Sequence, residues 1–199
     1  MPFLDLETTH LFYEQFGEGP DIVWLAGGDM PGSSWHEFQL PGFSGFRNTT
    51  WDARGVGQTE SSATTPWPIS AHAADCIRLI EKCCNAPVFL IALSMGSCIA
   101  QEISLIRPDL VKAAILMGAC ARKSGFIDEW EAAEIALRRS GTELPADFAV
   151  IHYALLMYPA EVLGDDELWA KLRPIVARDY GYRDPLALAE QWQAMAGWP

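Results

Sequence analysis

The sequence has few basic residues and no long apolar stretch, and each shortage excludes a class of function. Only 14 Lys and Arg residues stand against 26 Asp and Glu residues, which leaves a formal net charge of −12. Nucleic-acid binding needs clustered basic side chains that neutralise phosphates, so a nucleic-acid partner is excluded. No apolar run approaches the ~18 residues of a membrane span, and the first residues lack the pattern of a signal peptide. We therefore expect a cytoplasmic protein that binds no membrane.

Signatures of metal and cofactor sites are also missing. The five cysteines are an odd set in which Cys83 and Cys84 are adjacent, a spacing that matches neither a disulfide framework nor a zinc site. Gly55 and Gly57 lack the third glycine and the following helix of a dinucleotide fingerprint, and there is no phosphate-binding loop. We expect free thiols, no metal and no cofactor.

Apolar runs alternate with helical patterns over the first 118 residues. Residues 2–17 alternate polar and apolar side chains, which predicts a strand pair. Short apolar runs at 22–26 and 88–93 predict buried strands, and further strands are predicted around 46–51 and at 111–117. A helix that Ser70 could cap is predicted up to about Cys84, and a second helix from Met95 to about Arg107. Strands alternating with helices favour a mostly parallel sheet with helices on both faces.

The pattern changes after Gly118, where no further strand is predicted. Residues 127–140, 146–158, 166–180 and 185–196 all have helical patterns, and Asp165 and Asp184 are expected to cap two of these helices. The chain therefore divides into two parts. Residues 1–119 form the sheet-containing part, and residues 120–199 form a helical cap or lid.

Ser94 stands where the strand at 88–93 meets the helix that starts at Met95. A nucleophile elbow needs such a bend, because a strained turn holds the serine hydroxyl above the ends of the strands. Small residues must stand two positions before and after the serine, and Ala92 and Gly96 occupy them here. The helix also directs its N-terminal N–H groups toward developing negative charge. Ser94 is therefore the candidate nucleophile.

Two loops before the elbow strengthen this interpretation. Gly27 and Gly28 lie in a glycine-rich loop after the first buried strand, where a second oxyanion donor is expected. The turn at residues 52–59 follows the next strand. Three such features in this order are hard to attribute to chance.

At this point the sequence resembles an α/β-hydrolase, nearest the haloperoxidase-like esterase and lactonase branch. Residues 94–103, SMGSCIAQEI, are similar to the S-M-G-G-x-x-A-Q-E run of that branch, and residues 52–59, DARGVGQT, to its D-x-R-G-x-G-x-S turn. The resemblance is good from about residue 10 to 118 and weaker through the cap. It implies an α/β fold with the sheet of an α/β-hydrolase and a helical cap.

The resemblance also implies roles for single residues. Ser94 would be the nucleophile, and the backbone N–H groups of Met95 and Gly28 would form the oxyanion hole. The family usually has His-Gly before the donor loop, whereas this chain has Ala26 and Gly27. Asp52 and Arg54 are expected to hold their turn rather than to contact substrate.

The acid and the base of a catalytic triad are not visible. In this fold the acid and then the histidine follow the serine, each after a further strand. Beyond Ser94 the sequence has one histidine, His152, inside the predicted cap. The simplest account is that the chain is the N-terminal two-thirds of a longer hydrolase. The sheet would then be incomplete, with an apolar edge that a C-terminal fragment or a second chain covers.

The leading hypothesis is a serine hydrolase that acts on a carboxylic ester, thioester or lactone with a small hydrophobic acyl group. Gly27, His36, His152 and Trp130 are candidate residues of its pocket, although packing or surface roles are favoured for the two histidines.

Epoxide hydrolases and dehalogenases of this fold use Asp at the elbow, so Ser94 excludes both, whereas C–C bond hydrolases and perhydrolases share the serine. The alternatives are a non-catalytic binding or assembly protein that lacks a complete triad, and a swapped homodimer in which His152 completes the partner's site.

Overall fold

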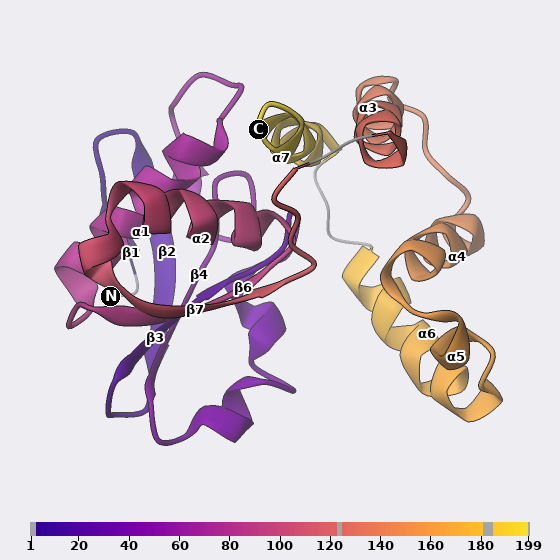
Figure 1. The fold of residues 1–199 in the computed structure, drawn as a ribbon. Helices are drawn as coiled ribbons and strands as arrows, with labels where there is room; N and C mark the ends of the chain where they lie inside the picture. The colour runs from indigo at the N-terminus through magenta and orange to yellow at the C-terminus, as the bar shows by residue number, and fades with distance from the viewer. Residues whose placement is uncertain (1–2, 123–124, 181–184, 199) are drawn as a thin grey trace.

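A mixed β-sheet forms the centre of the computed structural model, which describes residues 3–122, 125–180 and 185–198 (Figure 1). The strand order is β1-β2-β4-β3-β6-β7, and β5 pairs with β2 beside that path. Strands β4, β3, β6 and β7 run parallel to one another, whereas β1 and β2 pair antiparallel. The strands are β1 (Phe3–Asp5), β2 (Thr9–Phe16), β3 (Asp21–Leu25), β4 (Arg47–Trp51), β5 (Glu60–Ser61), β6 (Val88–Leu93) and β7 (Val111–Met117).

The two faces of the sheet have different covers. Helices α1 (Ile69–Cys83) and α2 (Met95–Ile106) lie side by side on one face (Figure 1). The other face packs against the segment that contains the 3₁₀ helices η1 (Gly32–Trp35) and η2 (Leu40–Phe43). The predicted parallel α/β sheet is confirmed, and short 3₁₀ turns rather than long helices cover its second face.

Alternation along the buried strands builds these two layers. Successive side chains of a strand point to opposite faces. Val23 and Leu25 of β3 therefore join the core cluster on the side of α1 and α2, whereas Ile22 and Trp24 join the second cluster, where Trp24 packs on Trp35. Strand β3 is apolar from Ile22 to Leu25, as the sequence pattern indicated, whereas the buried positions of β4 include the polar Asn48, Thr49 and Thr50.

The helical block after β7 consists of α3 (Phe126–Arg139), α4 (Ala146–Met157), the short α5 (Ala160–Leu163), α6 (Asp166–Tyr180) and α7 (Pro185–Ala196). The four helices expected from the sequence are confirmed to within a residue or two, and α5 was not predicted. In Figure 1, α4, α5 and α6 stand away from the sheet, while α7 lies near its upper edge. Ala194 and Met195 of α7 belong to the main core cluster. The last helix is therefore packed on the sheet-containing part as well as on α3.

Two helix starts can be compared with their predicted caps. Pro68, in extended conformation, is the residue before α1, and Ser70 is the second residue of the helix, so the prediction that Ser70 caps it is wrong. Proline suits the start of a helix because it lacks an N–H that would need a partner there. Asp165 does cap α6, since its Oδ1 accepts the N–H groups of Glu167 and Leu168, each at 2.9 Å. Asp184 lies outside the described residues.

Strand β7 is the last strand of the sheet within the described residues, and most of its residues are exposed. Ile115 is 55% exposed and Leu116 39%. Exposed apolar side chains beside an unpaired strand edge form a surface that proteins normally cover.

The five cysteines are free. No helix of the described residues is long and apolar enough to cross a membrane.

Candidate active site

Ser94 occupies a strained bend between β6 and α2. Its backbone has φ 51° and ψ −119°, a conformation that residues with a side chain rarely adopt. The bend is held from both sides, because the Ser94 N–H donates to the Met117 carbonyl at 2.9 Å and the Ser94 carbonyl accepts the Ser97 N–H at 2.8 Å. Ser94 is exposed although Ala92 and Met95 beside it are buried. The turn therefore presents this hydroxyl out of the core.

Gly96 is required by the end of β3 rather than by the elbow alone. A Cβ atom at Gly96 would lie 2.6 Å from the Ala26 carbonyl oxygen and closer still to that of Leu25. Real Cβ atoms do not come so near to backbone oxygens. The missing side chain lets the first turn of α2 pack directly on the strand that carries the Gly27–Gly28 loop.

Ser97 holds the first turn of α2 against two strand ends. The residue has no exposed surface. Its hydroxyl lies 3.2 Å from the Ala92 carbonyl oxygen and 2.9 Å from that of Met117, and it can donate to either. Ser97 stands where the S-M-G-G-x-x-A-Q-E run has its second glycine. Its hydroxyl connects the bend at Ser94 to β6 and β7. The sequence offered one signal for this role, namely a polar residue at a position that must be buried.

The loop after β3 lies against the elbow. A Cβ atom at Gly27 would lie 3.5 Å from the Cβ of Ser94, and one at Gly28 would lie 3.8 Å from the Cβ of Met95. The structure thus brings together the four residues that the sequence assigned to the nucleophile, the oxyanion donors and the loop. Asp29, the next residue, has a positive φ of 69°, so this loop also contains backbone strain.

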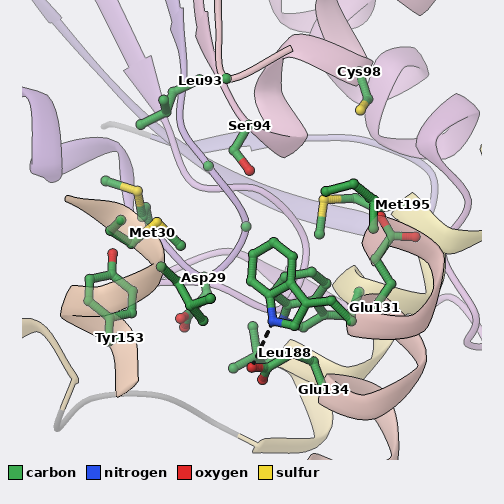
Figure 2. A pocket seen from close by; sticks show the side chains of 18 of the residues that line it. Asp29, Met30, Leu93, Ser94, Cys98, Glu131, Glu134, Tyr153, Leu188 and Met195 are labelled. Atoms are coloured by element: carbon green, nitrogen blue, oxygen red, sulfur yellow. Dashed lines mark hydrogen bonds between the residues drawn. The ribbon is translucent and has the colours of Figure 1, made fainter. Parts of the chain in front are cut away.

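Ser94 lines a cavity of about 520 Å³ between the sheet edge and the helical block after β7. In Figure 2 the Ser94 hydroxyl points into this space, with Met30 and Met195 on either side. Its volume is within the usual range for a small-molecule site. Apolar side chains from the strand end and from four helices supply much of its wall, among them Leu93, Cys98, Ile127, Leu156, Leu188 and Met195.

A polar cluster forms the cap side of the cavity, around the buried Glu134 of α3. Glu134 accepts hydrogen bonds from Trp130 Nε1 at 3.3 Å and from Arg138 at 3.1 Å, and His152 Nε2 lies 3.6 Å from it. Trp130, Glu134, Arg138 and His152 all line the cavity. Trp130 and His152 were predicted pocket residues, whereas Glu134 was missed, because a glutamate in a helix is ordinarily exposed.

His36 is placed elsewhere, which corrects its assignment as a pocket residue. Its Nε2 lies 3.1 Å from Thr50 Oγ1 and 3.7 Å from a carboxylate oxygen of Glu14, and its ring packs edge-on against Phe16. His36 is not among the residues that line the cavity. The 3₁₀ helix η1 ends at Trp35, and the chain there faces the second core cluster instead of the elbow.

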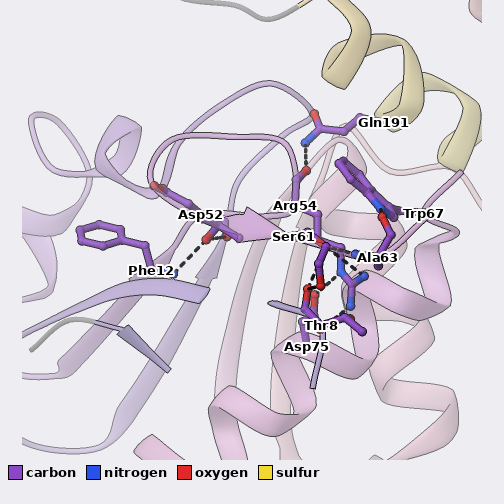
Figure 3. A network of polar contacts seen from close by, with 11 residues as sticks. Thr8, Phe12, Asp52, Arg54, Ser61, Ala63, Trp67, Asp75 and Gln191 are labelled. Atoms are coloured by element: carbon purple, nitrogen blue, oxygen red, sulfur yellow. Dashed lines mark hydrogen bonds and ion pairs between the residues drawn. The ribbon is translucent and has the colours of Figure 1, made fainter. Parts of the chain in front are cut away.

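Asp52 and Arg54 organise the turn after β4. The two carboxylate oxygens of Asp52 accept the N–H groups of Gly32 and Gln58, both at 2.8 Å, and burial raises the pKa of this carboxyl. Arg54 forms a two-pronged ion pair with Asp75 of α1, with N–O distances of 2.6 and 2.9 Å (Figure 3). These contacts bind the turn to its neighbours. Within the described part of the chain, no group of three or more His, Cys, Asp or Glu side chains could hold a metal ion.

Comparison with known proteins places this geometry in a family. A family model described as "alpha/beta hydrolase fold" matches residues 24–173. The "Putative non-heme bromoperoxidase BpoC" of Mycobacterium tuberculosis is 34% identical over 159 residues, which cover 79% of this chain and 60% of that protein. The crystal structure of the same protein superposes with a TM-score of 0.86, at 29% identity, over 92% of this chain and 68% of that one.

Ester-hydrolysing proteins are also among the relatives. A "Pimeloyl-[acyl-carrier protein] methyl ester esterase" of Aeromonas hydrophila is 27% identical over 119 residues, 59% of this chain and 44% of that protein. The enol-lactonase of Burkholderia xenovorans shares the fold with a TM-score of 0.83 at 20% identity, over 99% of this chain and 74% of that one. The chain thus spans about 60% or less of the length of these curated relatives.

Proposed function

Because the chain belongs to the alpha/beta hydrolase fold family, we propose that it is a serine hydrolase that forms an acyl-enzyme on Ser94. The substrate is a carboxylic ester, thioester or lactone. One observation carries the proposal: an exposed serine hydroxyl, held by a strained backbone at the start of α2, lines a cavity with a largely apolar wall.

The chemistry follows from the groups around this hydroxyl. The Ser94 oxygen attacks the acyl carbon, and the negative charge that develops on the carbonyl oxygen is stabilised by the N–H groups of Met95 and Gly28. The N-terminus of α2 adds its dipole to this stabilisation. The alcohol or thiol then leaves with a proton, and water hydrolyses the acyl-enzyme. The oxygen of Ser94 thereby regains its proton.

The apolar wall of the cavity supports a hydrophobic acyl group as the substrate. Leu93, Leu156 and Met195 surround the space that such a group would fill. Burial of apolar surface stabilises binding by about 25 cal/mol per Å². The names of the similar esterase and enol-lactonase agree with acyl transfer to water.

A base must still take the serine proton, and we propose that it comes from a polypeptide segment that pairs with β7. This segment, a C-terminal fragment or a second chain, would cover the exposed apolar side chains of Ile115 and Leu116 and extend the sheet. It would supply the histidine and the acid that orients it.

A second candidate function is a non-catalytic binding protein. It is favoured by the position of His152, whose Nε2 lies beside Glu134 in the cap. That contact gives the histidine a partner within the cap. A His152→Ala variant tests this candidate. If the variant loses both turnover and the labelling of Ser94, the result would instead favour His152 as the base.

A fluorophosphonate probe tests the proposal directly. The protein is isolated from its own cells under non-denaturing conditions, together with any chain that accompanies it, and both labelling and hydrolysis of short acyl esters are measured. We expect labelling and turnover that disappear in Ser94→Ala. The control is Ser104→Ala on the same helix, since the Ser104 hydroxyl only bonds the Ala100 carbonyl at 2.7 Å. Undiminished turnover by Ser94→Ala would refute an acyl-enzyme on this residue, and a wild-type protein that resists the probe would favour the binding protein.

A further inference from the structure

Gln191 is a polar side chain of α7 with no exposed surface. Its two ends bind two different loops. Gln191 Oε1 accepts the N–H of Asp29 at 2.5 Å, and Gln191 Nε2 donates to the Arg54 carbonyl at 2.9 Å. Figure 3 shows the second contact, which reaches from α7 down to the turn after β4. A fully buried amide that uses both its donor and its acceptor connects three elements far apart in the sequence.

The first contact acts on the oxyanion loop. The N–H of Asp29 belongs to the peptide unit that joins it to Gly28, so fixing this N–H fixes the plane of that peptide. Gly28 itself lies within reach, because a Cβ atom there would be 3.7 Å from Gln191 Oε1 and 3.8 Å from the Cβ of Met95. The carboxamide therefore lies directly beside the loop that faces the elbow.

Strain in the loop makes such support necessary. Asp29 has φ 69°, and a residue with a side chain in this backbone conformation is strained and persists only when its surroundings enforce it. The hydrogen bond from Asp29 to Gln191 is one such constraint. Without it, the backbone at Gly28, which joins this peptide to the one that carries the Gly28 N–H, loses a restraint.

The second contact binds the Gln191 side chain to a turn that is itself held in place. Arg54 is held by its ion pair with Asp75. The neighbouring Gly55 lies against α7, since a Cβ atom there would approach the Cβ of Ala187 to 3.0 Å. The Nε2 end of Gln191 is thus bound to a fixed turn, and its Oε1 end transmits that position to the loop.

We propose that Gln191 is a positioning residue for the oxyanion hole. By holding the Gly28–Asp29 peptide it restrains the backbone at Gly28, and through it the preceding peptide, whose Gly28 N–H would face the substrate. This role rests on the proposed function of Ser94. The amide satisfies both contacts, whereas leucine has neither a donor nor an acceptor and an ionised glutamate has no donor.

Variants at position 191 test the role through kinetics. Gln191→Leu and Gln191→Glu are compared with Gln193→Leu, a change to a half-buried glutamine on the same helix. Loss of one oxyanion donor lowers kcat by about 10²–10³-fold, so a misplaced donor in Gln191→Leu should lower kcat by at least about tenfold at similar KM. Active sites are counted by fluorophosphonate titration, so that a smaller folded fraction is not mistaken for slower turnover.

The pH dependence separates positioning from a general loss of structure. In Gln191→Glu an ionised carboxylate would face the Arg54 carbonyl, and on protonation it regains a donor. The ratio of its kcat to that of the wild type should therefore rise as the pH falls, whereas the ratio for Gln193→Leu should stay flat. A flat ratio for Gln191→Glu, or wild-type kcat per titrated site in Gln191→Leu, overturns the inference.

The two proposals fail in different ways. If Ser94→Ala turns substrate over as the wild type does, the proposed function is refuted, and the role of Gln191 with it. If Ser94→Ala is inactive while Gln191→Leu keeps its full kcat per active site, the function stands and only the positioning role is refuted.

Discussion

Replacement of Gly96 by alanine is the sharpest test of the elbow geometry. The added Cβ would lie 2.6 Å from the Ala26 carbonyl oxygen and 2.7 Å from the Leu25 carbonyl carbon. All the nearest atoms belong to the backbone of β3 and its loop, so no flexible side chain can move aside. To restore an ordinary contact distance, the start of α2 must move from β3 by about 1 Å.

That displacement should affect activity more than stability. Overpacking of a core by one methyl group costs about 1–3 kcal/mol of unfolding free energy. A misplacement of about 1 Å among reacting groups can lower the rate roughly 10²-fold. Because Met95, whose N–H is a proposed oxyanion donor, is the residue before Gly96, the shift acts directly on the proposed site. We expect a folded protein with a melting temperature lowered by several degrees and a strongly reduced rate of fluorophosphonate labelling.

The matched control is Gly42→Ala, since a Cβ atom at Gly42 would meet no atom within 4 Å. Labelling rate and unfolding free energy are measured for both variants and the wild type. If Gly96→Ala labels as fast as Gly42→Ala and is equally stable, the close packing of α2 on β3 does not set the position of the nucleophile. The reasoning about the elbow would then be refuted.

Two further predictions concern the buried charges under the turn after β4. Asp75→Asn removes the partner of the buried Arg54, and chemical denaturation should show a loss of about 3–5 kcal/mol. His72 is fully buried. Its pKa is lowered from 6.5 to about 4, mainly because burial disfavours the charged imidazole and also because the positive charge of Arg54 lies nearby. The unfolded chain therefore binds the proton more readily, so stability should fall as the pH drops from 6.5 to 4, by about 3 kcal/mol in total from this group. A His72→Leu variant should lack this component, and an unchanged pH dependence would contradict it.

Local patterns in the sequence were enough to predict most elements. Strand β6 and helix α2 were predicted with the bend at Ser94 between them, because period and burial are properties of neighbouring residues. The small residues at Ala92 and Gly96 were noted for the same reason. The cap of α1 was mispredicted, since both Ser70 and Pro68 suit a helix start and only the observed helix boundary decides between them.

The site was predicted in part. The Gly27–Gly28 loop was singled out because it follows the first buried strand, where a second oxyanion donor was expected, and the structure places it against Ser94. The structure adds Glu134 and Gln191, which no local pattern singles out, and Ser97, whose only signal was a polar residue at a position that must be buried. His36 lies away from the cavity. The path of the chain through η1 depends on how the apolar residues of this segment, such as Trp35, pack on the second face of the sheet.

The sequence alone determined the strand–turn–helix at Ser94, since backbone conformation and burial there depend on residues adjacent in the chain. Only the tertiary structure decided what surrounds the serine. The Asp29 N–H and the Gln191 side chain that binds it are 162 positions apart, and their contact depends on where α7 docks. Docking reflects the shape and burial of whole surfaces rather than any short segment. The contact of Gln191 with the loop at Gly28 and Asp29 was therefore visible only once the chain was folded.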